Sequence, residues 1–227
     1  MSAWPEIPRV HLTLRCNKHC SYCAVGPVTA TFRELTAAEW LDRIQQFPGS
    51  WVILSGGEPT LYRDFVRLVQ QCPKSCMIYS NFTTPLDPQA FDPRRVRWRA
   101  TLHTNHPREA EQFCLRVAAF RNGGFDVLTH SAHRLNREVE AVCATYGISL
   151  QTVGLQLPPP QIHRPVRCTY GVVLIGPDGR RYHCSSRMSR RDEGAVLPTG
   201  APRTIVCQQA HRCNACDGEH AKRTPIE

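Results

Sequence analysis

Three cysteines near the start of the chain have the residue type and the spacing needed for metal chemistry. Cys16, Cys20 and Cys23 are spaced Cys-x3-Cys-x2-Cys, directly after an apolar-rich run at residues 10–14 that predicts a short strand. Such a tight loop can bring three thiolates to one metal centre, and thiolates suit iron–sulfur clusters and zinc. Zinc usually takes four protein ligands, and no further cysteine follows until Cys72. An iron–sulfur cubane held by three cysteines would keep one iron open for a substrate or cofactor.

A second motif follows the second predicted strand. The apolar run at residues 51–54 leads directly into Ser55-Gly56-Gly57-Glu58-Pro59, called here the GGEP motif. A Gly-Gly pair by itself indicates only a tight turn. Glycines also let a backbone approach a bound ligand closely, and a proline fixes the conformation of a turn.

The cysteine loop (residues 15–23) and the GGEP motif together resemble the signature motifs of the radical SAM enzymes. The resemblance implies that Cys16, Cys20 and Cys23 are the catalytic centre and ligate a [4Fe–4S] cluster. The open iron of that cluster would bind S-adenosylmethionine. The further cofactor-binding residues that the resemblance implies are Tyr22, Gly56, Gly57, Glu58, Pro59, Ser80, Asn81 and His103. The alternative is a loop of buried or zinc-bound cysteines.

Strand-like and helix-like segments alternate through the first two thirds of the chain. Thr36–Glu39 has the form of a capping box and predicts the start of the first helix. The predicted strands lie at residues 10–14, 51–54, 76–80, 97–102, 125–129 and 149–155. Further helices are predicted at residues 64–72, from a cap at Asn105 or His106 to Gly123-Gly124, and at residues 135–146.

Six strands alternating with helices predict an α/β fold with a parallel sheet and right-handed crossovers. Six repeats are too few for a closed eight-stranded barrel. The count resembles the partial (β/α)6 barrel of the radical SAM family. Ligands of parallel α/β folds lie at the carboxyl ends of the strands, where His103 and His130 are further candidates to face a substrate.

Three consecutive prolines at Pro158–Pro160 interrupt the pattern and predict a domain boundary, with a barrel at residues 1–157 and a smaller domain at residues 158–227. Cys168 is followed by an apolar strand at 171–175, a turn at 176–179 and a return strand to Cys184. A hairpin with a later Cys-x2-Cys pair fits a zinc ribbon. The pattern also resembles the twitch domain, a short form of the SPASM domain. That resemblance implies a second, auxiliary [4Fe–4S] cluster on Cys168, Cys184, Cys213 and Cys216, with Cys207 as a competitor for one position.

Composition limits the class of protein. The formal net charge is +9, and 25 of the 28 basic residues are arginines scattered along the chain. Scattered arginines without a long basic run do not predict a nucleic-acid partner. The sequence shows no apolar run long enough for a membrane span and no signal peptide, so we expect a cytoplasmic protein. In that compartment cysteines are better read as metal ligands than as disulfides. Arg187–Arg203 matches no motif.

The resemblance implies an oxidoreductase-type enzyme that cleaves S-adenosylmethionine reductively, forming a 5′-deoxyadenosyl radical that takes hydrogen from a substrate. It also implies an electron donor such as flavodoxin or ferredoxin.

A small molecule is the favoured substrate, because twitch-type enzymes of similar size oxidise a carbinol in aminocyclitol biosynthesis. The nine residues before the first strand are also too few for a peptide-binding domain. Modification of a ribosomally made peptide and ring formation on a nucleotide are alternatives. A zinc-dependent nucleic-acid-binding module is the non-enzymatic alternative, and it leaves the GGEP motif without a purpose.

Overall fold

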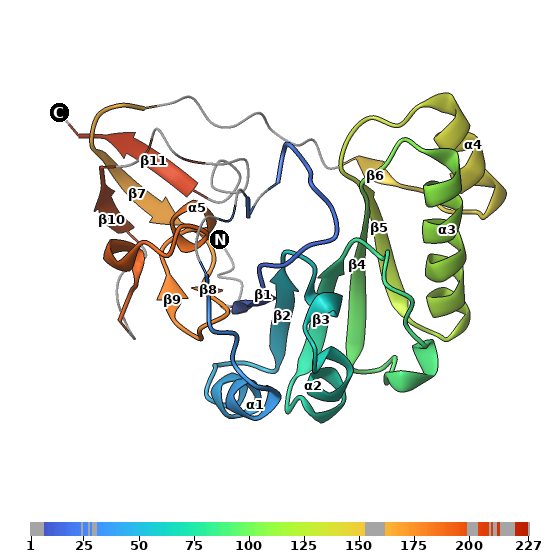
Figure 1. Ribbon diagram of the computed structural model, residues 1–227, viewed down its shortest axis with the longest axis horizontal. Coiled ribbons are helices and arrows are strands. Elements are labelled where there is room, and N and C mark those ends of the chain that lie inside the picture. The colour runs from blue at the N-terminus through green and yellow to red at the C-terminus, as the bar shows by residue number, and fades with distance from the viewer. Residues whose placement is uncertain are drawn as a thin grey trace.

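The computed structural model describes residues 7–23, 25–26, 28, 31–152, 162–198, 204–208, 210, 213 and 221–226. Within them the chain forms one large sheet, one small sheet and helices that pack on the large sheet (Figure 1). The predicted boundary after residue 157, the end of the sixth predicted strand and Cys216 lie outside the described residues.

The large sheet has eight strands in the order β6-β5-β4-β3-β2-β1-β8-β9. Strands β1 to β6 and β8 pair in parallel, and only β8 and β9 pair antiparallel. The strands are β1 (Arg9–Thr13), β2 (Trp51–Gly56), β3 (Ser75–Ser80), β4 (Val96–Leu102), β5 (Asp126–Ser131), β6 (Gln151–Thr152), β8 (Leu174–Ile175) and β9 (Arg181–Tyr182). The predicted parallel sheet of an α/β fold is therefore confirmed.

Four helices connect the parallel strands, and their ends have clear local causes. They are α1 (Ala37–Gln45), α2 (Phe65–Gln71), α3 (Pro107–Asn122) and α4 (Arg137–Thr145). The predicted capping box is present at the start of α1, where Thr36 and Glu39 bond to each other's backbone N–H groups. Asn136 caps α4 by accepting from the N–H of Val139. Proline occupies the first turn of α3, where its missing N–H costs nothing.

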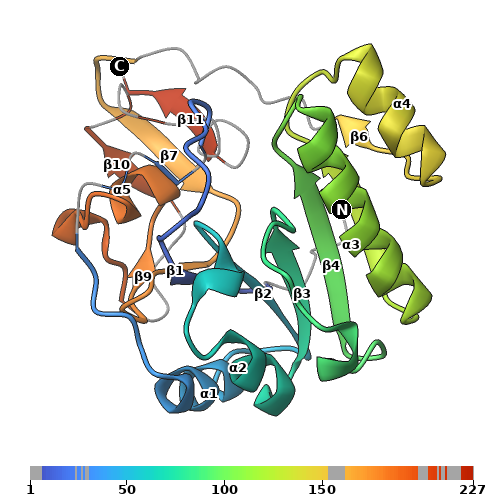
Figure 2. The ribbon, with the colours of Figure 1, turned by 45° about the vertical axis from the view of Figure 1, so that its right-hand side comes forward.

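The helices lie on one face of the large sheet (Figure 2). The main hydrophobic core is formed by buried residues of these helices and of the sheet. Alternate residues of each strand supply that face; in β4 they are Val96, Trp98, Ala100 and Leu102, all of them buried. Trp98 is the centre of an aromatic cluster, with ring centroids 4.9 Å from Phe120 and 5.3 Å from Phe82. The other residues of the strands point to the opposite face, called here the inner face.

The carboxyl-terminal part differs from the prediction in one respect. The antiparallel hairpin is present as β8 and β9, but β8 also pairs in parallel with β1 and so extends the large sheet. The cysteine-bearing strand β7 (Val166–Tyr170) is separated from β8 by a bend that begins at Gly171. Strand β7 is the centre of a three-stranded antiparallel sheet, between β10 (Thr204–Cys207) and β11 (Ala221–Pro225). The sequence predicts that the strands after residue 158 form one small domain. In the structure β7 belongs to the small sheet, whereas β8 and β9 belong to the large sheet.

Candidate active site

The cysteine loop covers the carboxyl end of the large sheet and surrounds two adjoining cavities. A cavity of about 540 Å³ is lined by Cys16, Cys20 and Cys23 together with Gly57. A second cavity of about 190 Å³ is lined by the same three cysteines and by most of the predicted cofactor-binding residues: Tyr22, Gly56, Gly57, Glu58, Ser80, Asn81 and His103. The structure therefore brings the two sequence motifs and the ends of β2, β3 and β4 to one place. Pro59 follows as a buried residue of a short 3-10 helix.

Each of the three sulfur atoms has a nitrogen close to it. The backbone N–H of Lys18 donates to Cys16 Sγ at 3.4 Å, and that of Gly26 donates to Cys23 Sγ at 3.3 Å. Cys20 Sγ lies 3.7 Å from Nδ1 of His103. Hydrogen bonds to cysteine sulfurs tune thiolate-bound metal centres. The cysteine loop thus supplies the sulfur donors, and Lys18, Gly26 and His103 place a nitrogen next to each of them.

The three thiols form no disulfide. Burial raises the pKa of Cys16, and the nearby negative charges of Glu58, Cys23 and Cys20 raise it further, against the lowering effect of the Lys18 N–H. A cavity that gathers this many negative groups suits a positively charged centre. In the part of the chain that the structure describes, no three His, Cys, Asp or Glu side chains converge to metal-binding distances. The cysteines line a shared cavity without converging on one point.

The two glycines of the GGEP motif are required by the closeness of the cysteine loop. A Cβ atom on Gly56 would lie 2.1 Å from the Thr13 carbonyl oxygen, and one on Gly57 would lie 2.3 Å from that of Arg15. Gly56 also has φ of +145°, which favours glycine. Two backbone hydrogen bonds hold the contact, from Gly57 N–H to Thr13 and from Glu58 N–H to Arg15. The glycines therefore fasten β2 to the base of the cysteine loop.

The Glu58 carboxylate is almost completely buried and is held by four donors. Oε1 accepts from the N–H of Thr60 at 3.2 Å, from its hydroxyl at 2.7 Å and from the Ser80 hydroxyl at 2.8 Å. Oε2 accepts from the N–H of Asn81 at 2.7 Å. Burial raises the pKa of Glu58, and these hydrogen bonds oppose the increase. Since Oε2 has one partner among the described residues, it can accept a further hydrogen bond from a ligand in the cavity.

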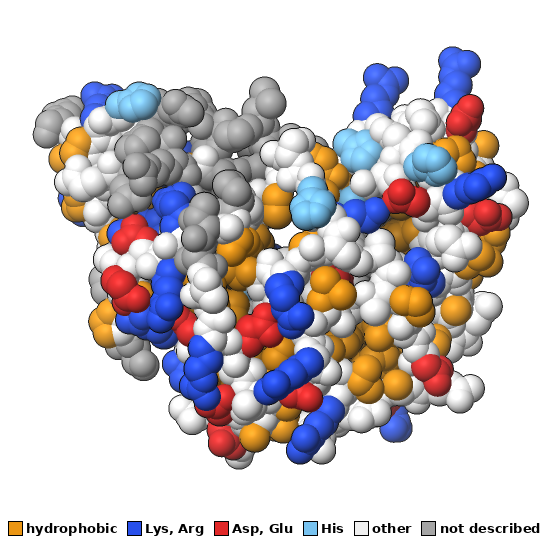
Figure 3. All heavy atoms as spheres, viewed as in Figure 1, with side chains coloured by type: hydrophobic (Ala, Val, Ile, Leu, Met, Phe, Trp, Pro, Cys, Tyr) orange, Lys and Arg blue, Asp and Glu red, His pale blue; other side chains and the backbone are white. Residues whose placement is uncertain are grey.

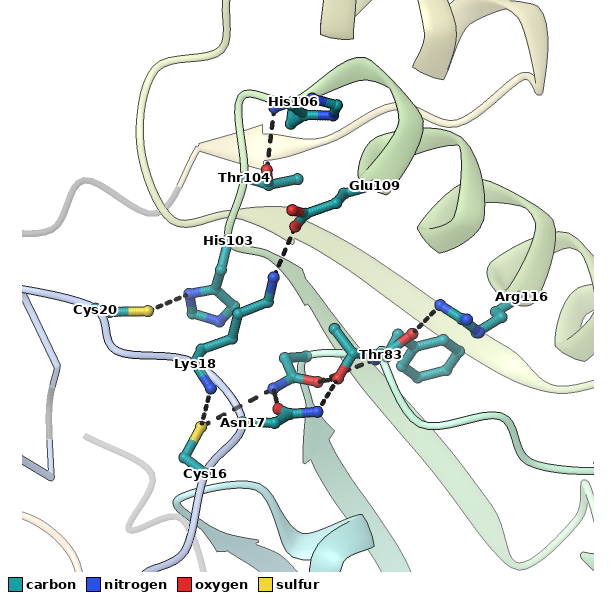
Figure 4. A network of polar contacts seen from close by, with 12 residues as sticks. Cys16, Asn17, Lys18, Cys20, Thr83, His103, Thr104, His106, Glu109 and Arg116 are labelled. Carbon is teal, nitrogen blue, oxygen red and sulfur yellow. Dashed lines mark hydrogen bonds and ion pairs between the residues drawn. The ribbon is translucent and has the colours of Figure 1, made fainter.

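A polar network joins the cysteine loop to the ends of β3 and β4 (Figure 4). Asn81 donates to the Asn17 side-chain oxygen at 2.8 Å, and Asn17 donates to the Thr83 hydroxyl at 2.7 Å. Lys18 forms an ion pair with Glu109 of α3 at 2.7 Å. Sequence reasoning missed Asn17 and Lys18, although both lie inside the cysteine motif, because polar side chains between metal ligands give no pattern of their own.

His103 is the contact point between β4 and the cysteine loop. Its Nδ1 lies 3.2 Å from the Tyr22 hydroxyl, and the two rings stack with centroids 6.0 Å apart. Burial lowers the pKa of His103 to about 4, with smaller effects from the charges of Lys18 and His133. The imidazole is therefore neutral near pH 7. His130, in contrast, does not line the two cavities around the cysteine loop.

The small sheet gathers some of the carboxyl-terminal cysteines. Cys207 is the register partner of Val166, two residues from Cys168, so both thiols share one sheet face. They belong to one buried cluster with Ala210, whose carbonyl accepts from the N–H of Cys213. Burial lowers the pKa of Arg187, but its hydrogen bond and ion pair with Asp192 outweigh this effect and raise the pKa, with smaller contributions from Cys207 and Cys184. Cys207 therefore shares a buried cluster with Cys168, a member of the predicted ligand set.

Comparisons with known proteins agree with this fold. Residues 10–167 match the Radical SAM superfamily, and the chain belongs to that family. Membership implies a [4Fe–4S] cluster and S-adenosylmethionine as cofactors. None of the curated proteins compared with this chain matches it.

Three solved structures align with this chain, and the one with a TM-score above 0.5 supports the fold. Streptococcus suis SuiB aligns with a TM-score of 0.51 and 16% identity, covering 64% of this chain and 38% of SuiB. SuiB bound to S-adenosylmethionine aligns with a TM-score of 0.49 and 15% identity, over 64% of this chain and 38% of that one. The enzyme anSMEcpe, solved with AdoMet and the Kp18Cys peptide, aligns with a TM-score of 0.48 and 12% identity, over 94% of this chain and 83% of that one. This chain thus spans about 38% of the length of SuiB.

No helix in the described part of the chain has the length and apolar character needed to cross a membrane. On the face shown in Figure 3, Lys and Arg side chains are interspersed with acidic and other polar ones and form no continuous basic patch. The basic side chains are therefore scattered over the face that this view shows.

Proposed function

We propose that Cys16, Cys20 and Cys23 ligate the [4Fe–4S] cluster and that the GGEP motif, Ser80 and Asn81 form the binding site for S-adenosylmethionine. The observation that carries this proposal is the shared cavity, which the three thiols line together with Gly56, Gly57 and Glu58. When bound, the cluster and S-adenosylmethionine supply a 5′-deoxyadenosyl radical that removes hydrogen from a substrate. The enzyme is in our proposal cytoplasmic and receives its electrons from a flavodoxin- or ferredoxin-type donor.

The residues of the chain contribute by binding and orientation. Four donors hold the Glu58 carboxylate in one orientation. Its Oε2 atom is therefore held in place to accept a hydrogen bond from an ammonium group such as that of methionine. Tyr22 offers an aromatic face beside the cavity, held by its contact with His103. The neutral His103 side chain adds no positive charge next to Cys20, because its pKa is about 4. Pre-positioned groups of this kind lower the cost of ordering a bound cofactor.

We also propose a twitch-like domain with an auxiliary [4Fe–4S] cluster held by Cys168, Cys184, Cys213 and Cys216, with Cys207 as an alternative ligand. Support comes from the shared face of Cys168 and Cys207 and from the contact between Ala210 and Cys213. Single replacement of Cys184 or Cys207 by Ala should identify which of the two is the ligand. Loss of about four irons per chain marks a ligand to the auxiliary cluster, whereas bound zinc in place of those irons would contradict this cluster.

The proposed substrate is a small molecule that is oxidised or rearranged; a ribosomally made peptide is the alternative. SuiB has been solved with the precursor peptide SuiA, and anSMEcpe with a peptide, but similarity at 12–16% identity supports the fold alone. The substrate class must therefore be argued from the side chains of this chain.

The proposed function is tested on the anaerobic protein reconstituted with iron and sulfide. With dithionite as reductant, we expect added S-adenosylmethionine to be converted to 5′-deoxyadenosine. Bound zinc without any cleavage would contradict the proposal and favour a zinc-dependent binding module.

A further inference from the structure

The inner face of the large sheet carries arginines, although it lies next to the proposed radical site. Strand pairing places Tyr79 of β3 beside Arg99 of β4, and Thr101 of β4 beside His130 of β5. These residues alternate with buried core residues such as Trp98 and Ala100, so they point to the face opposite the helices. Tyr79 and Thr101 also line the smaller cavity under the cysteine loop. Arg99 therefore lies within one pleat of that cavity.

Positive charge on this face exceeds negative charge. Arg9 of β1 lies over the Tyr79 ring at 5.1 Å, and Arg97 lies over the Trp51 ring at 4.8 Å. Arg97 is paired with Asp126 at 3.6 Å. Arg99 forms no ion pair with any residue that the structure describes, and it is only partly exposed. A half-buried guanidinium without a counter-ion is costly unless a ligand supplies one.

His130 has an unused polar atom on the same face. Its Nδ1 is buried and has no hydrogen-bond partner among the described residues. Arg99 pairs with Leu128 and Thr101 pairs with His130, so Arg99 and His130 are diagonal neighbours on one face of adjacent strands. Burial lowers the pKa of His130, and the positive charge of Arg99 contributes. A neutral imidazole can donate one hydrogen bond from Nδ1 when the proton is on that nitrogen. Together the two side chains present a cation and a hydrogen-bonding group on the inner face, beside the cavity-lining residues Tyr79 and Thr101.

We propose that Arg99 and His130 bind a carboxylate or phosphate group of the substrate, so that the substrate of this enzyme is an anion. The planar guanidinium matches the geometry of both groups, with two parallel N–H···O bonds. Binding there holds the anionic end of the substrate on the inner face and leaves the remainder directed towards the cysteine loop. This inference rests on the proposed function, because it assigns the substrate class for the same site.

The test is a calorimetric titration of the reconstituted protein, without S-adenosylmethionine, with inorganic phosphate and separately with acetate. We expect saturable binding of one anion per chain, and the tighter-binding anion indicates which group the substrate carries. In Arg99→Gln the binding should be about tenfold weaker, since a charge-assisted hydrogen bond is lost. Arg99→Lys, which keeps the charge, should restore part of the affinity. Arg67→Gln, an exposed arginine on α2 at the helical side, is the matched control and should bind like the wild type.

The possible outcomes distinguish a failure of the anion site from a failure of the proposed function. If the wild type binds neither anion saturably, or if Arg67→Gln weakens binding as much as Arg99→Gln, the inference is wrong even when S-adenosylmethionine is cleaved. If no cleavage occurs, the proposed function fails, whereas the anion titration still reports on Arg99. Should Arg99→Gln not fold, His130→Gln gives a second measurement, and unchanged binding in that variant would contradict the role of His130.

Discussion

The Tyr22 hydroxyl lies 3.2 Å from Nδ1 of His103, and the two rings stack at an interplanar angle of 11°. This contact fixes the aromatic side chain of the cysteine loop against the end of β4. In the proposed site Tyr22 offers its aromatic face to S-adenosylmethionine, so the ring should matter more than the hydroxyl.

Replacing Tyr22 therefore separates the ring from the hydroxyl. Tyr22→Ala should weaken binding of S-adenosylmethionine up to about tenfold, because an aromatic stacking partner is lost. Tyr22→Phe keeps the ring and should bind nearly as well as the wild type. Equilibrium binding to the reconstituted protein is the measurement, and equal affinities of Tyr22→Ala and the wild type would show that the ring does not contact the cofactor.

The close approach of the GGEP motif to the cysteine loop predicts a severe effect of a single methyl group. Gly57→Ala would place its Cβ 2.3 Å from the Arg15 carbonyl oxygen and should lower the free energy of unfolding by about 2 kcal/mol or more. Gly49→Ala is the control, because Gly49 has φ of +76° but no neighbour within 4 Å. It should cost about 1 kcal/mol. Urea unfolding measures the free energy of unfolding of both variants. An equal decrease in the two would show that the contact between Gly57 and Arg15 is not tight.

The four donors around Glu58 predict that a neutral isostere will not replace it. In Glu58→Gln the side-chain NH₂ must face at least one N–H or hydroxyl donor, leaving a buried polar group unsatisfied at a cost of about 1–3 kcal/mol. Affinity for S-adenosylmethionine should also fall. Glu111→Gln, a carboxylate on α3 that accepts only from Tyr146 in the described structure, serves as a control. A Glu58→Gln protein with wild-type stability and affinity would refute this role.

His11 predicts a component of the pH dependence of stability. Burial, and then the charge of Arg9, lower the pKa of His11 to about 3, whereas the unfolded chain has the ordinary value of 6.5. The unfolded state therefore binds a proton that the folded state does not, and the free energy of unfolding decreases as the pH falls from 6.5 towards 3. Between about pH 7 and about pH 5 the loss is about 2 kcal/mol. The measurement is the free energy of unfolding in urea at several pH values, and in His11→Gln it should not show this decrease. The same decrease in both proteins would contradict the role of His11.

Sequence patterns predicted the large sheet well, because its strands and helices have strong local signals. The run at residues 51–54 lies within β2. The capping box at Thr36–Glu39 begins α1, and Gly123 caps the end of α3. Much of the candidate active site could be predicted because many of its residues lie in two short motifs, the cysteine loop and the GGEP motif. The shared cavity brings those motifs together with Ser80, Asn81 and His103.

Long-range relationships were not visible in the sequence. Nothing local indicates that β8 pairs with β1, because a two-residue parallel strand has no characteristic pattern. The pairing of Lys18 with Glu109 also joins residues far apart in the chain. The sequence also showed no sign that Gly56 and Gly57 approach the backbone of Thr13 and Arg15 closely. Each of these depends on packing between segments distant in sequence.

The most direct test of the central claim compares the wild type with Cys20→Ala after anaerobic reconstitution, using Cys143→Ala, outside both candidate cysteine groups, as the control. The account predicts about eight irons per chain and formation of 5′-deoxyadenosine for the wild type and the control. For Cys20→Ala it predicts about four irons and no 5′-deoxyadenosine. Undiminished formation of 5′-deoxyadenosine by Cys20→Ala would contradict the assignment of the cysteine loop as the catalytic centre.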